Sequence, residues 1–145
     1  MRIKNTRIVL MIKSIASLLL FSCISSMSAA EQFSESDINS WLIQTANVTN
    51  KQLPLTSTGM GIRWDLTTAG PGRKFTYQYT YLNQSSNQIN KAMWQAKIDS
   101  EVVKNCQVQD IAQFMRYGVI VTYAYYGNDG GFVGRSDLTP TKCGY

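Results

Sequence analysis

The sequence contains no histidine, and this absence limits the chemistry that the chain can perform. Histidine is the usual general base near neutral pH, a common metal ligand and the activator of many serine and cysteine nucleophiles. Only nine carboxylates remain as acid–base groups, and they are spread along the chain. We therefore expect no metal site, no cofactor and no catalytic residue. The alternative is a small envelope-associated hydrolase with Asp/Glu chemistry, in which Asp65 and Asp137 would meet in a sheet.

Acidic residues are absent from the first thirty positions. The charges there are four basic residues: Arg2, Lys4, Arg7 and Lys13. An apolar run at 15–21 and the small residues Ser28-Ala29-Ala30 follow them. This order predicts a secretory signal peptide over residues 1–30, cleaved after Ala30. The apolar run is shorter than the roughly 20 residues that a bilayer span needs, so we expect a periplasmic or secreted protein with no membrane span.

Cys23 offers an alternative end to the signal segment. The order Leu20-Phe21-Ser22-Cys23 resembles a bacterial lipoprotein signal, in which the cysteine carries a lipid anchor. Phe21 departs from that pattern, because the residue two places before the cysteine is usually small or β-branched. We therefore expect ordinary cleavage and keep a lipid anchor at Cys23 as the minority alternative.

Excess positive charge is absent once the signal peptide is removed. The chain has fourteen basic and nine acidic residues, and four of the basic ones lie in the signal. The mature chain then contains ten basic and nine acidic residues, so its net charge is +1. A nucleic-acid footprint requires clustered positive charge, and no nucleic-acid partner is expected.

Only two cysteines, Cys106 and Cys143, follow the signal peptide. In an exported chain, a pair of cysteines indicates a disulfide. We therefore predict a bond between Cys106 and Cys143.

Residues 31–145 are predicted to form a single α+β domain. An N-terminal helix is expected over 31–48, and Trp41 is expected in its core-facing stripe. The remaining elements are, in order, a hairpin with strands at 58–68 and 73–82, a helix at 88–104, a short helical segment at 109–117 and a final hairpin within 119–143. Two hairpins separated by a helix predict a four-stranded antiparallel sheet with helices on one face.

Aromatic residues alternate along the predicted strands. Phe75, Tyr77, Tyr79 and Tyr81 share one face of their strand, as Val119, Val121, Tyr123 and Tyr125 do in the final hairpin. We expect most of these side chains to pack against the helices. The outer face and tip of the final hairpin then hold the candidate partner-binding residues, which are Tyr126, Asn128, Asp129 and Arg135.

Several motifs of the chain resemble a group of small exported proteins of Gram-negative bacteria. They are Lys51-Gln-Leu-Pro-Leu, Thr68-Ala-Gly-Pro-Gly, Phe75-Thr-Tyr-Gln-Tyr, Gly118-Val119, Tyr123-Ala-Tyr-Tyr, Asp129-Gly130 and the two cysteines. The resemblance implies a periplasmic or secreted, disulfide-bonded domain and carries over no catalytic residue. We therefore predict a non-enzymatic domain that binds another envelope or secreted protein, as an inhibitor or immunity protein or as an accessory of a secretion or pilus machine.

Overall fold

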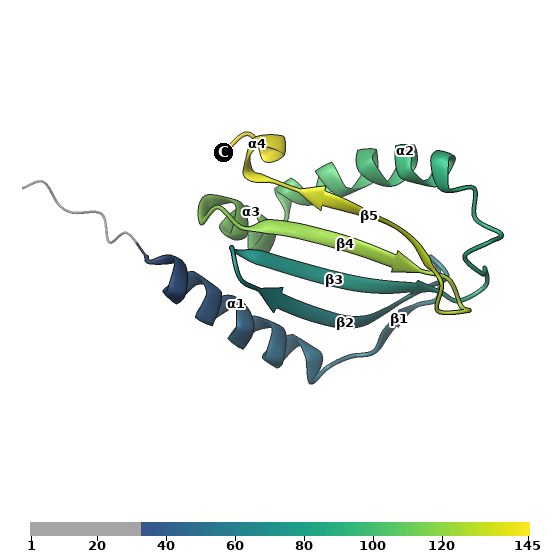
Figure 1. The fold of residues 1–145 in the computed structure, drawn as a ribbon, viewed down its shortest axis with the longest axis horizontal. Helices are drawn as coiled ribbons and strands as arrows, with labels where there is room; N and C mark the ends of the chain where they lie inside the picture. The colour runs from purple at the N-terminus through teal and green to yellow at the C-terminus, as the bar shows by residue number, and fades with distance from the viewer. Residues whose placement is uncertain (1–32) are drawn as a thin grey trace, which may run out of the picture. The chain divides into compact units, whose positions relative to one another are not determined.

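The computed structural model describes residues 33–145 (Figure 1). The predicted signal peptide, with Cys23 and the cleavage site after Ala30, lies outside the described residues. The elements are, in chain order, α1 (Glu35–Asn50), β1 (Leu55–Ser57), β2 (Ile62–Gly70), β3 (Lys74–Tyr81), α2 (Lys91–Val102), the 3₁₀-helix η1 (Val103–Gln107), α3 (Gln109–Arg116), β4 (Ile120–Tyr126), β5 (Phe132–Leu138) and α4 (Pro140–Cys143). Along this part of the chain, none of the helices has the length and apolar character that a membrane crossing requires.

Helix α1 begins directly after Ser34, which caps it. The Ser34 hydroxyl accepts a hydrogen bond from the Asp37 N–H at 3.1 Å, and the Asp37 carboxylate accepts one from the Ser34 N–H at 3.1 Å. This reciprocal capping box satisfies N–H groups that a helix start leaves unpaired. The helix therefore starts at Glu35, inside the predicted range, and extends to Asn50.

The five strands form one mixed sheet in the order β1-β2-β3-β4-β5. Strands β3 and β4 are parallel, and all other neighbours are antiparallel. The α+β class is confirmed, but the predicted sheet of four antiparallel strands is wrong. The reason is the connection through α2, η1 and α3, which returns the chain to the end of the sheet where β3 begins (Figure 1). A crossover of this kind produces a parallel pair.

A bulge at Asp65 interrupts β2 and breaks the alternation predicted for residues 58–68. The pairing with β3 shifts between Trp64 and Leu66, which leaves Asp65 as an extra residue. Trp64 and Thr67 therefore share one face of the sheet. Leu66, which the alternation places beside Trp64, lies on the opposite face and is 39% exposed.

Helices α1, α2 and α3 pack on one face of the sheet, as predicted. Trp94 of α2 lies against Tyr125 of β4, and Phe114 of α3 lies against Phe75 of β3. Helix α1 runs along β2 and α2 runs along β5, with β3 and β4 between them (Figure 1). The centre of the core is made of Leu42, Phe75, Phe114, Met115, Val119, Val121 and Leu138. We call the opposite, more polar face of the sheet the outer face.

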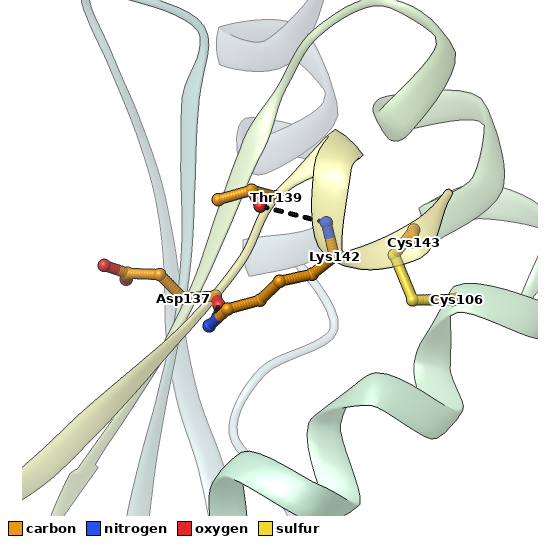
Figure 2. Close-up of a disulfide and its surroundings, with 5 residues drawn as sticks. All are labelled: Cys106, Asp137, Thr139, Lys142 and Cys143. Carbon is orange, nitrogen blue, oxygen red and sulfur yellow. Dashed lines mark hydrogen bonds between the residues drawn. A yellow bond between two sulfur atoms is a disulfide. The ribbon is translucent and has the colours of Figure 1, made fainter. Parts of the chain in front are cut away.

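The chain ends in a one-turn helix, α4, which is not among the predicted elements. Pro140 occupies its first position, and the Thr139 hydroxyl accepts a hydrogen bond from the Lys142 N–H at 3.3 Å. Cys143 forms the predicted disulfide with Cys106 of η1, with the two Cα atoms 5.5 Å apart (Figure 2). The bond fastens the end of β5 to the connection that follows α2.

Side chains, rather than another strand, occupy the outer edge of β5. They donate hydrogen bonds to three backbone carbonyls of this strand: Lys91 to Phe132 at 3.1 Å, Gln95 to Arg135 at 3.0 Å and Lys142 to Asp137 at 2.6 Å. Figure 2 shows Lys142 reaching back from α4 to Asp137. Because an unpaired edge is a template for strand addition, these contacts oppose pairing of a partner strand with β5.

The side chain of Asn50 occupies backbone hydrogen-bonding groups of β2 in a similar way. Its amide donates to the Thr67 carbonyl at 2.8 Å, and its side-chain oxygen accepts from the Thr67 N–H at 2.8 Å. The asparagine amide thereby replaces one residue of a neighbouring strand, at a level of β2 that lies before the start of the short strand β1.

Candidate protein-binding surface

Four partly exposed aromatic side chains lie on the helix-bearing face of β2 and β3. We call them the aromatic floor: Trp64, Tyr77, Tyr79 and Tyr81. Two buried tyrosines of β4, Tyr123 and Tyr125, continue the row toward β5.

The parallel pairing of β3 and β4 stacks the tyrosines of the two strands. It sets Tyr77 beside Tyr123 and Tyr79 beside Tyr125. The two ring pairs have centroid distances of 5.4 and 5.3 Å, each with 23° between the ring planes. Because side chains alternate with a period of two, this single register aligns every tyrosine on the face. Such offset stacking is favourable beyond simple burial.

The helices cover this row of rings unevenly. At one end Phe114 lies 4.8 Å from Phe75, which is only 1% exposed. On the β5 side the Trp94 ring lies 5.2 Å from Tyr125, which is 7% exposed. Tyr77 and Tyr79 lie between these two covered ends and remain partly exposed. Tyr77 and Tyr79 are therefore less buried than the rings at the two covered ends.

A close approach between α2 and β5 fixes the β5 side of the floor. A Cβ atom at Gly134 would lie 2.4 Å from Cζ3 of Trp94, so the indole rests directly on the glycine. The Trp94 Nε1–H also donates a hydrogen bond to the Tyr81 hydroxyl at 2.6 Å. Glycine at position 134 thus allows the contact that places both rings.

Burial raises the pKa of the Tyr77, Tyr79 and Tyr125 hydroxyls above the ordinary value of 10.0. For all three residues desolvation is the main cause, and neighbouring tyrosines add to it. The hydroxyls therefore stay neutral at physiological pH. The floor presents apolar rings with neutral hydrogen-bonding groups, which suits an uncharged or amphipathic partner surface.

The residues predicted for partner binding fall into two groups. Asn128 and Asp129 hold the β4–β5 turn against the loop before α2. Asp129 accepts hydrogen bonds from the N–H and the hydroxyl of Ser86 at 3.0 and 2.9 Å. The Asn128 amide donates to the Leu82 carbonyl at 3.3 Å. In the structure these two side chains are therefore engaged in loop contacts.

Tyr126 and Arg135 lie apart from the aromatic floor, on the outer face. The Tyr126 ring meets the half-exposed Phe132 ring edge to face, with centroids 5.6 Å apart. Arg135 is exposed and lies 3.9 Å from the Asp137 carboxylate. The structure thus separates the four predicted residues into a structural turn and an outer-face pair.

The carboxylates considered for a hydrolase are also separated. Asp65 pairs with Arg63 and accepts a hydrogen bond from Thr80, whereas Asp137 accepts one from Thr122. In the sheet Thr122 lies opposite Thr76, four residues along β3 from Thr80. The two acids therefore lie at different levels of the sheet. Within residues 33–145, no three potential metal-ligating side chains come together.

Comparison with known proteins identifies solved structures with a similar fold. No protein-family model matches the sequence, and no curated protein matches it. Among solved structures, the chain is similar to a protein described as secreted from Pseudomonas aeruginosa, with a TM-score of 0.64 and 14% identity over 75% of this chain and 95% of that one. The EpsS pilotin of the Vibrio vulnificus type 2 secretion system has a TM-score of 0.61 at 13% identity, covering 75% and 94% of the two chains.

The AspS pilotin of the type II secretion system of Vibrio cholerae is a third match. Its TM-score is 0.58 at 16% identity, covering 75% of this chain and 94% of the other. All three neighbours come from Gram-negative bacteria and are secreted or secretion-system proteins. The chain therefore shares its fold with these three proteins.

Proposed function

We propose that the protein is a non-enzymatic accessory protein of the bacterial envelope, which binds another exported protein through the aromatic floor. The observation that carries this proposal is the partial exposure of Trp64, Tyr77 and Tyr79 at the centre of the helix-bearing face. Packed helices normally bury the aromatic side chains of the sheet face that they cover, and these three side chains stay partly exposed. Tyrosine and tryptophan are also enriched at protein interfaces.

Fold similarity supports the secretion-accessory form of the proposal. Two of the structural neighbours are pilotins of type II secretion systems, and a third is described as secreted. The predicted signal peptide supports the same location, in the periplasm or outside the cell. Tyr126 and Arg135 on the outer face form a second, smaller contact surface in this proposal.

The side-chain contacts at the outer edge of β5 and beside Thr67 of β2 support one mode of partner binding. Strand addition is opposed at β5 by Lys91, Gln95 and Lys142, and at β2 by Asn50. We therefore expect the partner to place apolar side chains onto the floor rather than to extend the sheet. The neutral tyrosine hydroxyls then satisfy polar groups at the rim of the contact.

Two adjacent residues of β1 provide a matched test. Leu55 pairs with Trp64 and lies on the floor side, whereas Thr56 pairs with Arg63 and lies on the outer side. Both residues are exposed, so neither substitution removes core packing. Leu55→Glu adds a charge beside the floor, and Thr56→Glu adds the same charge on the opposite face.

The tagged wild-type protein and both variants are used to capture partners from a periplasmic extract. The proposal predicts one stoichiometric envelope protein with wild type and Thr56→Glu, and its loss with Leu55→Glu. Capture that is equal for both variants, or lost only with Thr56→Glu, contradicts the floor as the binding surface.

A further inference from the structure

A pocket separate from the aromatic floor lies between the first turns of α1 and the end of α3. Its volume is about 310 Å³, and its lining residues are Phe33, Asp37, Ile38, Trp41, Gln113 and Tyr117. This volume is at the lower end of the range typical of small-ligand sites. Half of the lining residues are aromatic, and one is a carboxylate.

Two of the aromatic rings in the pocket stand at steep angles to the third, which is the ring of Tyr117. Tyr117 contacts Phe33 with a centroid distance of 5.5 Å and an interplanar angle of 86°, and it contacts Trp41 at 5.6 Å and 69°. Phe33 and Trp41 thus stand steeply to the tyrosine ring, and together the three rings form walls of differing orientation. The face of an aromatic ring carries negative electrostatic potential, which attracts a cation placed over it.

Asp37 adds a full negative charge to the pocket. Its carboxylate accepts hydrogen bonds from the Ser34 hydroxyl at 2.6 Å and the Ser34 N–H at 3.1 Å, both through Oδ2. These bonds hold the pKa of the Asp37 carboxyl below its ordinary value. The group is therefore ionised at neutral pH.

The surrounding charges also favour a cation. No basic residue is among the six that line the pocket. Arg73 is not among the lining residues, and its guanidinium donates a hydrogen bond to the Tyr117 carbonyl at 3.1 Å. Glu35, in the first turn of α1 with Asp37, opposes the positive end of the helix dipole.

We propose that this pocket binds a single organic cation, an ammonium or guanidinium group, between the aromatic rings and the Asp37 carboxylate. Aromatic rings combined with a carboxylate are the usual recognition chemistry for such groups. The cation that we propose is a basic side chain of a protein, and preferential binding of choline in the test below would contradict this source and point to a lipid headgroup. The proposal is independent of the aromatic floor, because no residue is shared between the two sites.

The test follows the indole N–H signals of the three tryptophans by NMR in the exported protein. Three probes are titrated: N-acetyl-arginine amide, choline and 3,3-dimethylbutanol, the last being a neutral isostere of choline. The proposal predicts saturable shifts of the Trp41 signal with at least one cationic probe and none with the alcohol at the same concentration. The cation that binds more tightly identifies the source.

Two isosteric variants separate charge in the pocket from charge on the helix. Asp37→Asn removes the pocket charge and keeps a capping side chain, and we expect it to weaken binding about fivefold, the upper range for a single exposed ion pair. Glu35→Gln removes the same charge from the same turn outside the pocket, and we expect less than a twofold change. Equal binding of the alcohol, equal effects of the two variants, or shifts confined to Trp64 and Trp94 would overturn the proposal.

Discussion

Tyr79 of β3 stacks on Tyr125 of β4, with ring centroids 5.3 Å apart. The contact exists because the two strands run parallel and pair these residues directly. Tyr125 is covered by α2, and Tyr79 is left partly exposed at the edge of that cover. The stack is thus the point where the core of the domain becomes the proposed binding surface.

Alkaline pH should destabilise the protein through the stacked tyrosines. Burial raises the pKa of Tyr77, Tyr79 and Tyr125 in the folded state, so the unfolded chain loses these protons first. Stability is therefore unaffected by these groups below about pH 10 and falls as the pH rises above it, by about 1.4 kcal/mol per pH unit for each such tyrosine. Urea unfolding at pH 8 to 11, with tyrosinate absorbance at 295 nm, measures this effect. Free energies that stay constant from pH 9.5 to 11 would contradict the burial of these hydroxyls.

Gly134→Ala should destabilise the domain by about 1–3 kcal/mol, the usual effect of overpacking. The added methyl group would lie 2.4 Å from the Trp94 ring and force the indole away from β5. Gly70→Ala is the control, because a Cβ at Gly70 meets no atom within 4 Å. Urea unfolding and the near-ultraviolet circular dichroism of the indole report both changes. Equal midpoints for the two variants would show that Trp94 does not rest on Gly134.

The sequence predicts several features that depend on local chemistry. The alternation in β3 identifies the face that carries its tyrosines. The pairing of Cys106 with Cys143 follows from export and cysteine number. Each of these features depends on residues that are adjacent in sequence or on a single possible pair.

The sheet topology depends on the path of a long connection, which the sequence pattern does not specify. Helical segments at 88–104 and 109–117 are compatible with β4 running in either direction. The bulge at Asp65 has no signal in the alternating residues around it. The short elements β1 and α4 are set by tertiary contacts, including the Cys143 disulfide.

The proposed binding surface is harder to predict from the sequence than the fold. Alternation shows which face Tyr77 and Tyr79 occupy, but the extent of helix cover depends on where α1 and α2 lie. Asn128 and Asp129 are exposed, as the sequence suggests, but it does not show that Asp129 bonds to Ser86 and Asn128 to the Leu82 carbonyl. Trp41, predicted to face the core, packs on Phe114. The same side chain also lines the pocket between α1 and α3.

Removal of the disulfide should lower stability by about 2–4 kcal/mol, because the bond restricts the unfolded chain. The variant with both Cys106 and Cys143 replaced by Ser avoids a free thiol. Its urea midpoint should match that of reduced wild-type protein and lie below that of the oxidised protein. If oxidised and reduced wild type unfold at the same urea concentration, the bond does not stabilise the fold.

Asn50→Ala should destabilise the domain by about 1–3 kcal/mol, because it leaves the Thr67 N–H and carbonyl without their partner. Asn47→Ala removes an exposed asparagine from the same helix and serves as the control. Chemical unfolding measures the stability, and size-exclusion chromatography reports any self-association through the exposed edge of β2. A variant at Asn50 as stable as the Asn47 control would argue against this side-chain pairing.

Two adjacent residues of β3 test the proposed binding surface most directly. Tyr79 lies at the centre of the aromatic floor, and Gln78 points to the outer face, since it pairs with Leu66. A photo-cross-linking amino acid is placed at either position in the exported protein, and intact cells are irradiated. The account predicts an adduct with one envelope protein from position 79 and none from position 78. An adduct from position 78 alone, or from neither position, would contradict the claim that the floor binds a partner.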